Sequence, residues 1–222
     1  MMEQRLDPRL TTRSVFDRVS PELAMRAGTL PTATLHEAAG KIGVMPPAIK
    51  PVSAGMRIAG PAVTVHAPGG DNLWLHRGIY AARPGDVLVV SVSGHYEHGY
   101  WGEVMSTASQ VRGLAGLVID GCVRDAVLLA EIGFPVFARG LCIRGTAKDF
   151  AARGWINHPT LFDGLTVNAG DLIVGDADGV VAIPRERVGT VLDAAEQREE
   201  AEAAQLERLR AGETTLSMFG WD

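Results

Sequence analysis

Continuous apolar runs alternate with amphipathic stretches through the middle of the chain. The runs occupy residues 87–90, 116–119 and 135–138, and runs of this length are typical of strands that are buried on both faces of a sheet. The amphipathic stretches between them predict helices. Each stretch ends at a glycine, Gly113 or Gly133, and glycine commonly follows the last residue of a helix. This alternation of strands and helices indicates an α/β fold.

Two further elements are expected upstream of this region. Residues 57–66 predict a strand, which we expect to be broken or bulged at Gly60-Pro61, because neither residue suits the middle of a sheet. Closer to the N-terminus, Thr32 or Thr34 is expected to cap a short helix, since a threonine side chain can accept a hydrogen bond from a first-turn amide.

The final third of the chain has a different pattern of apolar and polar residues. Three short apolar segments, at residues 164–167, 171–174 and 179–183, are separated by Asn-Ala-Gly and Asp-Ala-Asp-Gly turns and predict antiparallel strands. Pro184 then begins a long helix rich in Glu, Arg, Ala and Leu. We expect this helix to span residues 184–211 and to reach about 40 Å at the usual rise per residue.

The long helix changes character along its length. Its first turns carry four apolar residues that can dock on the body of the protein: Val188, Val191, Leu192 and Ala195. Residues 196–208 are mostly polar. That part is either solvated or in contact with a neighbouring subunit, and we favour the second interpretation because so long a helix extends beyond a small core.

Length and composition fit one globular domain. The chain has 222 residues, 46% of them hydrophobic and 21% charged, and no low-complexity linker divides it. We therefore expect an N-terminal arm over residues 1–19 and a single domain over residues 20–222. The net charge of −5 argues against a nucleic-acid-binding surface, which is normally basic.

Cysteine content and hydropathy bear on the cellular compartment. Cys122 and Cys142 are too few for a disulfide framework. No apolar run approaches the roughly 20 residues that span a bilayer, and the N-terminal residues are not followed by the apolar segment of a signal peptide. These features predict a cytoplasmic protein without membrane association.

Three charged side chains are the strongest candidates for a functional site. Glu103 follows a glycine-rich loop and is expected to open a helix, whereas Arg124 and Asp125 follow an apolar strand and are expected at its carboxyl end. Ligands of α/β folds bind at the carboxyl ends of the strands. Two carboxylates and one guanidinium at this edge suit a hard cation together with an anionic substrate.

Other residues near this site are open to more than one interpretation. His95 and His98 have a spacing that suits a transition metal, but nothing else in the sequence completes a zinc site. They are expected either to face the substrate from a loop or to be solvated. Asp120 is expected to orient Arg124. Three aromatic residues are expected either to shape the pocket or merely to cover it: Tyr96, Tyr100 and Trp101.

Several motifs in the chain resemble one known family. They are PGDVLVV at 84–90, GE at 102–103, GLAGLVIDGCVRD at 113–125 and PVFARG at 135–140, with further support from VGDADGVV at 174–181, Arg198-Glu199 and RAGE at 210–213. From about residue 22 to its end, the chain is similar to the family that contains the RNase E inhibitor RraA and the class II pyruvate aldolases. The resemblance implies an α/β/β sandwich of swivelling-domain type with a long C-terminal helix. It also implies a homotrimer, or a hexamer of two stacked trimers, with active sites between subunits.

The resemblance implies a role for each charged candidate. Asp125 would be the direct ligand of Mg²⁺ or Mn²⁺, and Arg124 would bind the pyruvyl unit and stabilise its enolate oxygen. Glu103, where many aldolases of the family have Asp, would hold water molecules around the ion. Considered alone, the same residues are also explained by a helix cap at Asp125, a salt bridge at Arg124 and a first-turn acid at Glu103.

Two further contributions follow from the resemblance. The backbone amides of Val104 and Met105, at a helix N-terminus, would receive the substrate carboxylate. Glu199 would reach the site from a neighbouring subunit, with Glu196 and Glu200 as close competitors. A solvated charged helix face is the ordinary explanation of the same glutamates.

The function implied by the resemblance is a divalent-metal-dependent aldolase. It would cleave 4-hydroxy-2-oxo acids to pyruvate and would also decarboxylate oxaloacetate. The alternative is a non-catalytic RraA-like regulator that binds an RNA-degrading enzyme. A methyltransferase, a label also attached to the family, is disfavoured because no glycine-rich loop for S-adenosylmethionine follows the first strand.

Overall fold

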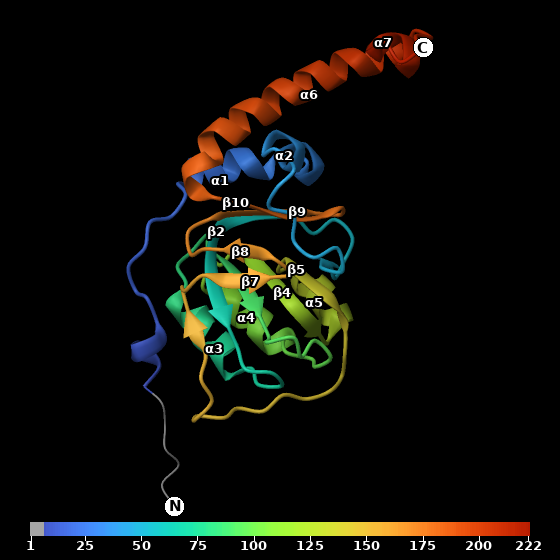
Figure 1. Ribbon diagram of the computed structural model, residues 1–222. Helices are drawn as coiled ribbons and strands as arrows, with labels where there is room; N and C mark the ends of the chain where they lie inside the picture. Colours follow the sequence, from blue (N-terminus) through green and yellow to red (C-terminus); the bar gives the residue numbers. More distant parts are fainter. Residues whose placement is uncertain (1–6) are drawn as a thin grey trace, which may run out of the picture.

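The protein is built in layers around one mixed β-sheet. The computed structural model describes residues 7–222, and Figure 1 shows α3, α4 and α5 on one side of the sheet and α1, α2 and α6 on the other. The helices are η1 Pro8–Thr11, α1 Pro21–Gly28, α2 Thr32–Ala38, α3 Leu73–Ala81, α4 Glu103–Val111, α5 Ala126–Ile132, η2 Arg185–Arg187, α6 Val188–Arg210 and α7 Thr215–Phe219.

The strands form one large sheet and one separate hairpin. They are β1 Lys50–Pro51, β2 Ile58–His66, β3 Val87–Ser91, β4 Gly116–Val123, β5 Val136–Leu141, β6 Trp155–Ile156, β7 Thr160–Phe162, β8 Leu165–Val167, β9 Leu172–Asp176 and β10 Gly179–Ile183. The large sheet has the order β1-β5-β4-β3-β2-β9-β10, with β6 also paired to β2, whereas β7 and β8 pair with each other. Strands β2, β3, β4 and β5 are parallel, so their carboxyl ends lie at one edge.

Three apolar cores hold the layers together. One core packs α3, α4 and α5 on the parallel strands and includes Trp74, Met105 and Phe134. A second core packs α1, α2 and α6 on β9 and β10. A third core lies between two β layers of the sheet, the parallel strands β2–β5 and the antiparallel pair β9–β10. The expected α/β/β arrangement with a long C-terminal helix is thus confirmed.

Strand β2 joins the two β layers without a break. Residues 58–61 pair with β9 in antiparallel fashion, and residues 62–66 pair with β3 in parallel. The partner therefore changes at Gly60-Pro61, where a break or bulge was expected. A side chain at position 60 would place its Cβ 2.3 Å from the carbonyl oxygen of Gly85, so only glycine allows this close packing.

The expected threonine caps are wrong. Pro31 is the N-cap residue of α2, and it makes no side-chain cap hydrogen bond. The Thr32 hydroxyl instead donates to the buried Asp176 carboxylate over 2.6 Å, and the Thr34 hydroxyl donates to Glu199 over 2.5 Å. Thr32 thus contacts β9 and Thr34 contacts α6. Both partners are distant in the sequence, so the local sequence does not predict these hydrogen bonds.

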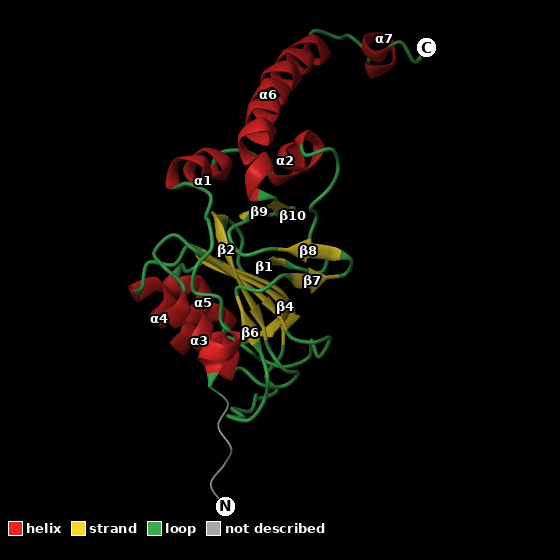
Figure 2. Cartoon of the chain, turned by 60° about the vertical axis from the view of Figure 1, so that its left-hand side comes forward, coloured by secondary structure: helices red, strands yellow, loops and turns green. Residues whose placement is uncertain are grey.

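The C-terminal helix docks through its first turns, as predicted, but it begins at Val188 rather than at Pro184, because the 3-10 turn η2 precedes it. Its four buried residues are Val188, Val191, Leu192 and Ala195. Beyond these residues α6 extends away from the body and carries α7 at its far end (Figures 1 and 2). The antiparallel pairing of β9 with β10 is also confirmed, while β8 pairs with β7.

The N-terminal segment runs along the body before α1. Residues 1–6 of the expected arm lie outside the described part of the chain. Further along, the amide of Arg13 donates to the Ile156 carbonyl over 3.1 Å, and Val19 is buried. Within residues 7–222, no helix combines the length and the apolar character needed to cross a membrane.

Candidate functional site

A polar cavity of about 260 Å³ lies where the parallel strands end. Its walls come from the start of α3, the loop before α4, the first turn of α4, the end of β4 and the loop after β5. The lining residues are Asn72, His76, Gly99, Tyr100, Trp101, Gly102, Val104, Met105, Arg124, Asp125 and Lys148. Four of the six predicted site residues line it: Arg124, Asp125, Val104 and Met105.

Asp125 connects two helices at the floor of this cavity. Its backbone is left-handed, with φ 63° and ψ 37°, and it occupies the N-cap position of α5 without a side-chain cap to that helix. Its Oδ2 instead accepts a 3.1 Å hydrogen bond from the amide of Glu103, the first residue of α4. The helix cap considered from sequence therefore exists, but it caps the other helix.

Two glycines allow this close approach. A Cβ at Gly102 would lie 2.2 Å from Asp125 Oδ2, and one at Gly99 would lie 2.4 Å from the Cys142 carbonyl oxygen and 3.2 Å from Arg124 Cβ. Any larger residue would displace the loop from the end of β4. The glycine-rich loop is thus needed for the geometry of Arg124 and Asp125.

The Arg124 guanidinium remains available to a ligand. Its backbone amide donates to the Trp101 carbonyl over 2.9 Å, which fixes the start of the side chain. The guanidinium Nε lies 3.8 Å from Asp125 Oδ2, and the side chain is 48% exposed. At this distance the pair is an ion pair without a hydrogen bond, so the guanidinium donors are not used up by Asp125.

The first turn of α4 offers backbone donors. First-turn amides have no partner within their own helix, and the amide of Glu103 is occupied by Asp125. The amides of Val104 and Met105 come next in the same turn, and both residues line the cavity. The Glu103 side chain itself is exposed and does not line the cavity.

Glu199 does not reach this cavity within one chain. It lies on α6, where its carboxylate accepts the hydrogen bond from Thr34. The role of Glu199 in a neighbouring subunit's site therefore remains a prediction.

Asp120 does not orient Arg124, contrary to expectation. Its Oδ1 accepts a 2.5 Å hydrogen bond from Arg139 Nε, and the Arg139 guanidinium lies 3.9 Å from the centre of the Tyr96 ring. Asp120 lies within the register shift of the β4–β5 pairing, between Ile119 and Cys122. Asp120 therefore pairs with Arg139 of the neighbouring strand β5 and not with Arg124, which is only four positions away in the sequence.

The loop histidines lie outside the cavity lining. The His98 ring packs 5.6 Å from Tyr100, whose hydroxyl donates to the His95 carbonyl over 2.6 Å. Among residues 7–222, no group of three or more His, Cys, Asp or Glu side chains could together hold a metal ion. Of the aromatic candidates, Tyr100 and Trp101 line the cavity and Tyr96 does not.

Three polar lining residues were missed by sequence reasoning. Asn72 donates from Nδ2 to the Tyr100 carbonyl over 3.0 Å, while its buried Oδ1 has no hydrogen-bond partner in the described chain. Burial lowers the pKa of the His76 imidazole, and the nearby Lys148 ammonium adds to the decrease. The i, i+4 spacing of Asn72 and His76 could have placed both on one face of α3. Lys148 lies in an irregular loop and gave no such signal.

The comparisons with known proteins agree on one family. The model of the RraA-like family, described as Aldolase/RraA, matches residues 24–182. A protein of Halalkalibacterium halodurans named "Putative 4-hydroxy-4-methyl-2-oxoglutarate aldolase" is 36% identical over 171 residues, which cover 77% of this chain and 80% of the relative.

Solved structures show the same architecture. An uncharacterized protein from Pseudomonas syringae superposes with a TM-score of 0.79 at 28% identity and covers 90% of this chain and 93% of its own. RraAS2 of Streptomyces coelicolor, described as an unusual member of the RNase ES inhibitor RraA protein family, superposes with a TM-score of 0.75 at 26% identity. That match covers 86% of this chain and 98% of RraAS2.

Proposed function

The chain belongs to the RraA-like (Aldolase/RraA) family, and from this premise we propose that it is a divalent-metal-dependent aldolase. It cleaves 4-hydroxy-2-oxo acids to pyruvate and decarboxylates oxaloacetate. The observation that carries the proposal is the cavity at the carboxyl ends of the strands, where the Arg124 guanidinium and the Asp125 carboxylate lie side by side.

The Asp125 carboxylate suits a magnesium ion. Only its Oδ2 accepts a hydrogen bond within the described chain, and the side chain is 36% exposed, so Oδ1 is free to meet a cation. Mg²⁺ commonly takes one or two protein carboxylates and keeps several of its waters, so a single aspartate is a sufficient anchor. When bound, Mg²⁺ or Mn²⁺ would supply Lewis-acid polarisation of the 2-oxo group.

Cationic and amide donors around Asp125 suit a 2-oxo acid. The amides of Val104 and Met105 would bind its 1-carboxylate at the N-terminus of α4. Arg124 would face the 2-oxo oxygen, and Lys148 adds a second positive charge to the cavity lining. A substrate with two carboxylates would place one on the amides of Val104 and Met105 and the other near the Lys148 ammonium.

The aldol cleavage then requires one proton acceptor. The 4-hydroxyl proton leaves, the C3–C4 bond breaks, C4 becomes a carbonyl group, and the bonding electrons pass into the enolate of pyruvate. Arg124 stabilises the charge that develops on the enolate oxygen, because a fixed cation is oriented before the reaction begins. Glu103 and the Glu199 of a second copy receive the proton through water, and protonation of C3 completes pyruvate.

Decarboxylation of oxaloacetate uses fewer of these residues. Loss of carbon dioxide generates the same enolate, so Arg124 and Asp125 are needed, but no hydroxyl proton has to be removed. Glu103 and Glu199 are therefore dispensable for this second reaction. A site completed by Glu199 from another chain also accords with a homotrimer or a hexamer.

A non-catalytic regulator of an RNA-degrading enzyme is the second candidate. It is favoured by the likeness to RraAS2, whose description names RNase ES inhibitor RraA. The polar cavity with an available guanidinium favours the enzyme, because a protein-binding ring has no need of one. The two functions are separated by pyruvate release from a panel of 4-hydroxy-2-oxo acids and from oxaloacetate, measured with EDTA and after adding back Mg²⁺ or Mn²⁺. Absence of metal-dependent pyruvate release from every compound would leave the regulator as the better explanation.

A further inference from the structure

A second cavity, of about 490 Å³, lies at the opposite end of the parallel strands from the candidate active site. Gly85 and Asp86, which directly precede β3, form part of its wall, whereas the first cavity lies beyond the strands' carboxyl ends. None of its lining residues takes part in the proposed reaction. Its volume is in the range of about 300–1,000 Å³ that is usual for small-molecule sites.

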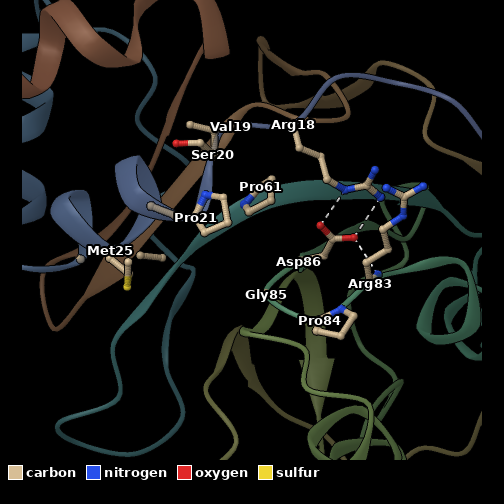
Figure 3. Close-up of a pocket in the computed structure, with 13 residues that line it drawn as sticks. Arg18, Val19, Ser20, Pro21, Met25, Pro61, Arg83, Pro84, Gly85 and Asp86 are labelled. Carbon is tan, nitrogen blue, oxygen red and sulfur yellow. Dashed lines mark hydrogen bonds and ion pairs between the residues drawn. The ribbon is translucent and has the colours of Figure 1, made fainter.

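The walls of this cavity are mainly apolar. Pro21 and Met25 of α1 form one side, and Pro61 of β2 and Pro84 face them (Figure 3). Ala24 of α1 also lines the cavity. Met25 lines the cavity and is itself 68% exposed to solvent. An apolar group bound between these walls would be removed from water, which stabilises a complex in proportion to the area buried.

One end of the cavity carries an unbalanced positive charge. The Asp86 side chain is only 1% exposed, and its two oxygens accept from Arg18 Nε over 2.9 Å and Arg18 Nη2 over 3.0 Å. The backbone amide of Arg83 adds a third donor at 2.8 Å. The Asp86 carboxylate thus has its hydrogen bonds without the Arg83 side chain, which makes no ion pair within residues 7–222.

The two arginines are arranged to receive an anion. Figure 3 shows the Arg83 and Arg18 guanidinium groups on the same side of Asp86. Only the Arg18 guanidinium is paired with the Asp86 carboxylate, so the positive charge of Arg83 stays uncompensated. A carboxylate is the natural complement, because it binds guanidinium through two parallel hydrogen bonds.

We propose that this cavity binds an amphipathic monocarboxylate, independently of the proposed catalytic function. The carboxylate meets Arg83 and the outer edge of Arg18, and the apolar body lies between α1 and the two prolines, Pro61 and Pro84. Both parts of the ligand are required, because the charge provides orientation and the apolar body provides the buried area.

Ligand-observed NMR titration of the full chain tests the proposal, with hexanoate as the probe. Two matched compounds separate the contributions: hexanol lacks the charge, and acetate lacks the apolar body. We expect saturable binding of hexanoate, and binding of hexanol and acetate that is weaker by about tenfold or more. Because tenfold is about 1.4 kcal/mol, such differences are readily measured.

Protein variants locate the binding. Arg83→Ala removes the free guanidinium but keeps the backbone amide that holds Asp86, and we expect it to weaken hexanoate binding about tenfold. Ala24→Leu fills the cavity from α1, and Met25→Trp narrows its mouth from an exposed position where folding is not at risk. Both should abolish binding. Arg153→Ala, which removes an exposed arginine elsewhere, is the matched control and should leave binding unchanged.

Several results would overturn the proposal. They are the absence of saturable hexanoate binding, binding that survives both Met25→Trp and Ala24→Leu, and equal weakening by Arg83→Ala and Arg153→Ala. A change in the number of subunits caused by Met25→Trp, measured by light scattering, would also overturn it, because the cavity would then be a contact between copies. Pyruvate release should be the same in all four variants, so loss of this cavity's function is distinguishable from loss of the proposed catalysis.

Discussion

The amide of Glu103 donates a 3.1 Å hydrogen bond to the carboxylate of Asp125, although the two residues are 22 positions apart. One oxygen of the proposed metal ligand is thereby held by the N-terminus of α4, where the positive end of the helix dipole stabilises its charge. The same first turn supplies the amides proposed to bind the substrate. Metal ligand and carboxylate receptor are thus positioned by one helix end.

The Asp125 carboxylate should be indispensable for turnover. Asp125→Asn keeps an acceptor for the Glu103 amide and a residue type that tolerates the left-handed backbone, but it loses the charge. We expect its pyruvate release to fall by more than the roughly 10–100-fold that loss of a supporting residue costs a metal site, with a melting temperature close to that of the parent chain. Full activity of Asp125→Asn at saturating Mg²⁺ would exclude this aspartate as the ligand.

Replacing the Arg124 guanidinium should reduce kcat rather than substrate binding alone. Arg124→Ala removes the cation that faces the developing charge, and we expect a loss of about 10²–10³-fold in kcat. Arg124→Lys keeps the charge in a different geometry and should recover part of that loss. Steady-state kinetics on oxaloacetate provide the measurement, with Arg144→Ala as an exposed arginine control. An unchanged kcat in Arg124→Ala contradicts the proposed role.

A methyl group at position 102 should disturb both stability and activity. Gly102→Ala places a Cβ 2.2 Å from Asp125 Oδ2, and overpacking of this kind costs about 1–3 kcal/mol. We expect a lower melting temperature together with slower pyruvate release. Gly189→Ala is the matched control, because outside its own stretch of helix no atom lies within 4 Å of the added Cβ and alanine is the better helix former. Equal behaviour of the two variants would show that the loop adapts to the added methyl group.

Glu199 should act across a subunit boundary and in one reaction only. Glu199→Ala is expected to slow aldol cleavage strongly while oxaloacetate decarboxylation persists, since only cleavage requires removal of a hydroxyl proton. Co-expression of Glu199→Ala chains with Asp125→Ala chains should restore cleavage at about a quarter of the sites, because random assembly brings the two intact residues together at that frequency in a ring. No recovery in the mixed oligomers, despite assembly, would argue that Glu199 has no such role.

His76 should make folding stability depend on pH below neutrality. Its pKa is lowered by burial and by Lys148, so the unfolded chain binds a proton at a higher pH than the folded chain does. The resulting stability is fully present above the unfolded value of about 6.5 and is lost as the pH falls through the lower folded pKa. His76→Gln should flatten that part of the curve in denaturant unfolding between pH 7.5 and 5.5. The prediction would be contradicted if the free energy of unfolding of the variant depended on pH as that of the parent chain does. It would also be contradicted if NMR gave the folded His76 a pKa at or above its ordinary value.

Elements dominated by local preference were predictable from the sequence. The apolar runs became β3, β4 and β5, and Gly113 and Gly133 adopt positive φ angles of 73° and 71° just after helices. The placement of Arg124 and Asp125 at the edge of the sheet follows from the same strand pattern. These features depend on side-chain burial and backbone sterics within a few residues, which a single sequence displays directly.

Choices among distant partners were not predictable in this way. Asp120 pairs with Arg139 rather than Arg124, and Thr32 bonds to Asp176 instead of capping its helix. Lys148 enters the cavity from a loop without any periodic pattern. A charged or hydroxyl side chain forms its bond with whichever complementary group the packed chain brings within about 3 Å, so its partner is set by tertiary distance.

The sequence by itself therefore determined the alternation of strands and helices, the edge at which Arg124 and Asp125 lie, and the presence of a long C-terminal helix. Only the tertiary structure decided that the Asp125 carboxylate is held by α4, that His76 and Lys148 join the site, and that a second cavity forms beside Arg83. The physical reason is range: burial patterns and backbone preferences act between near neighbours in the chain, whereas hydrogen bonds, ion pairs and cavities depend on where packing brings distant segments together.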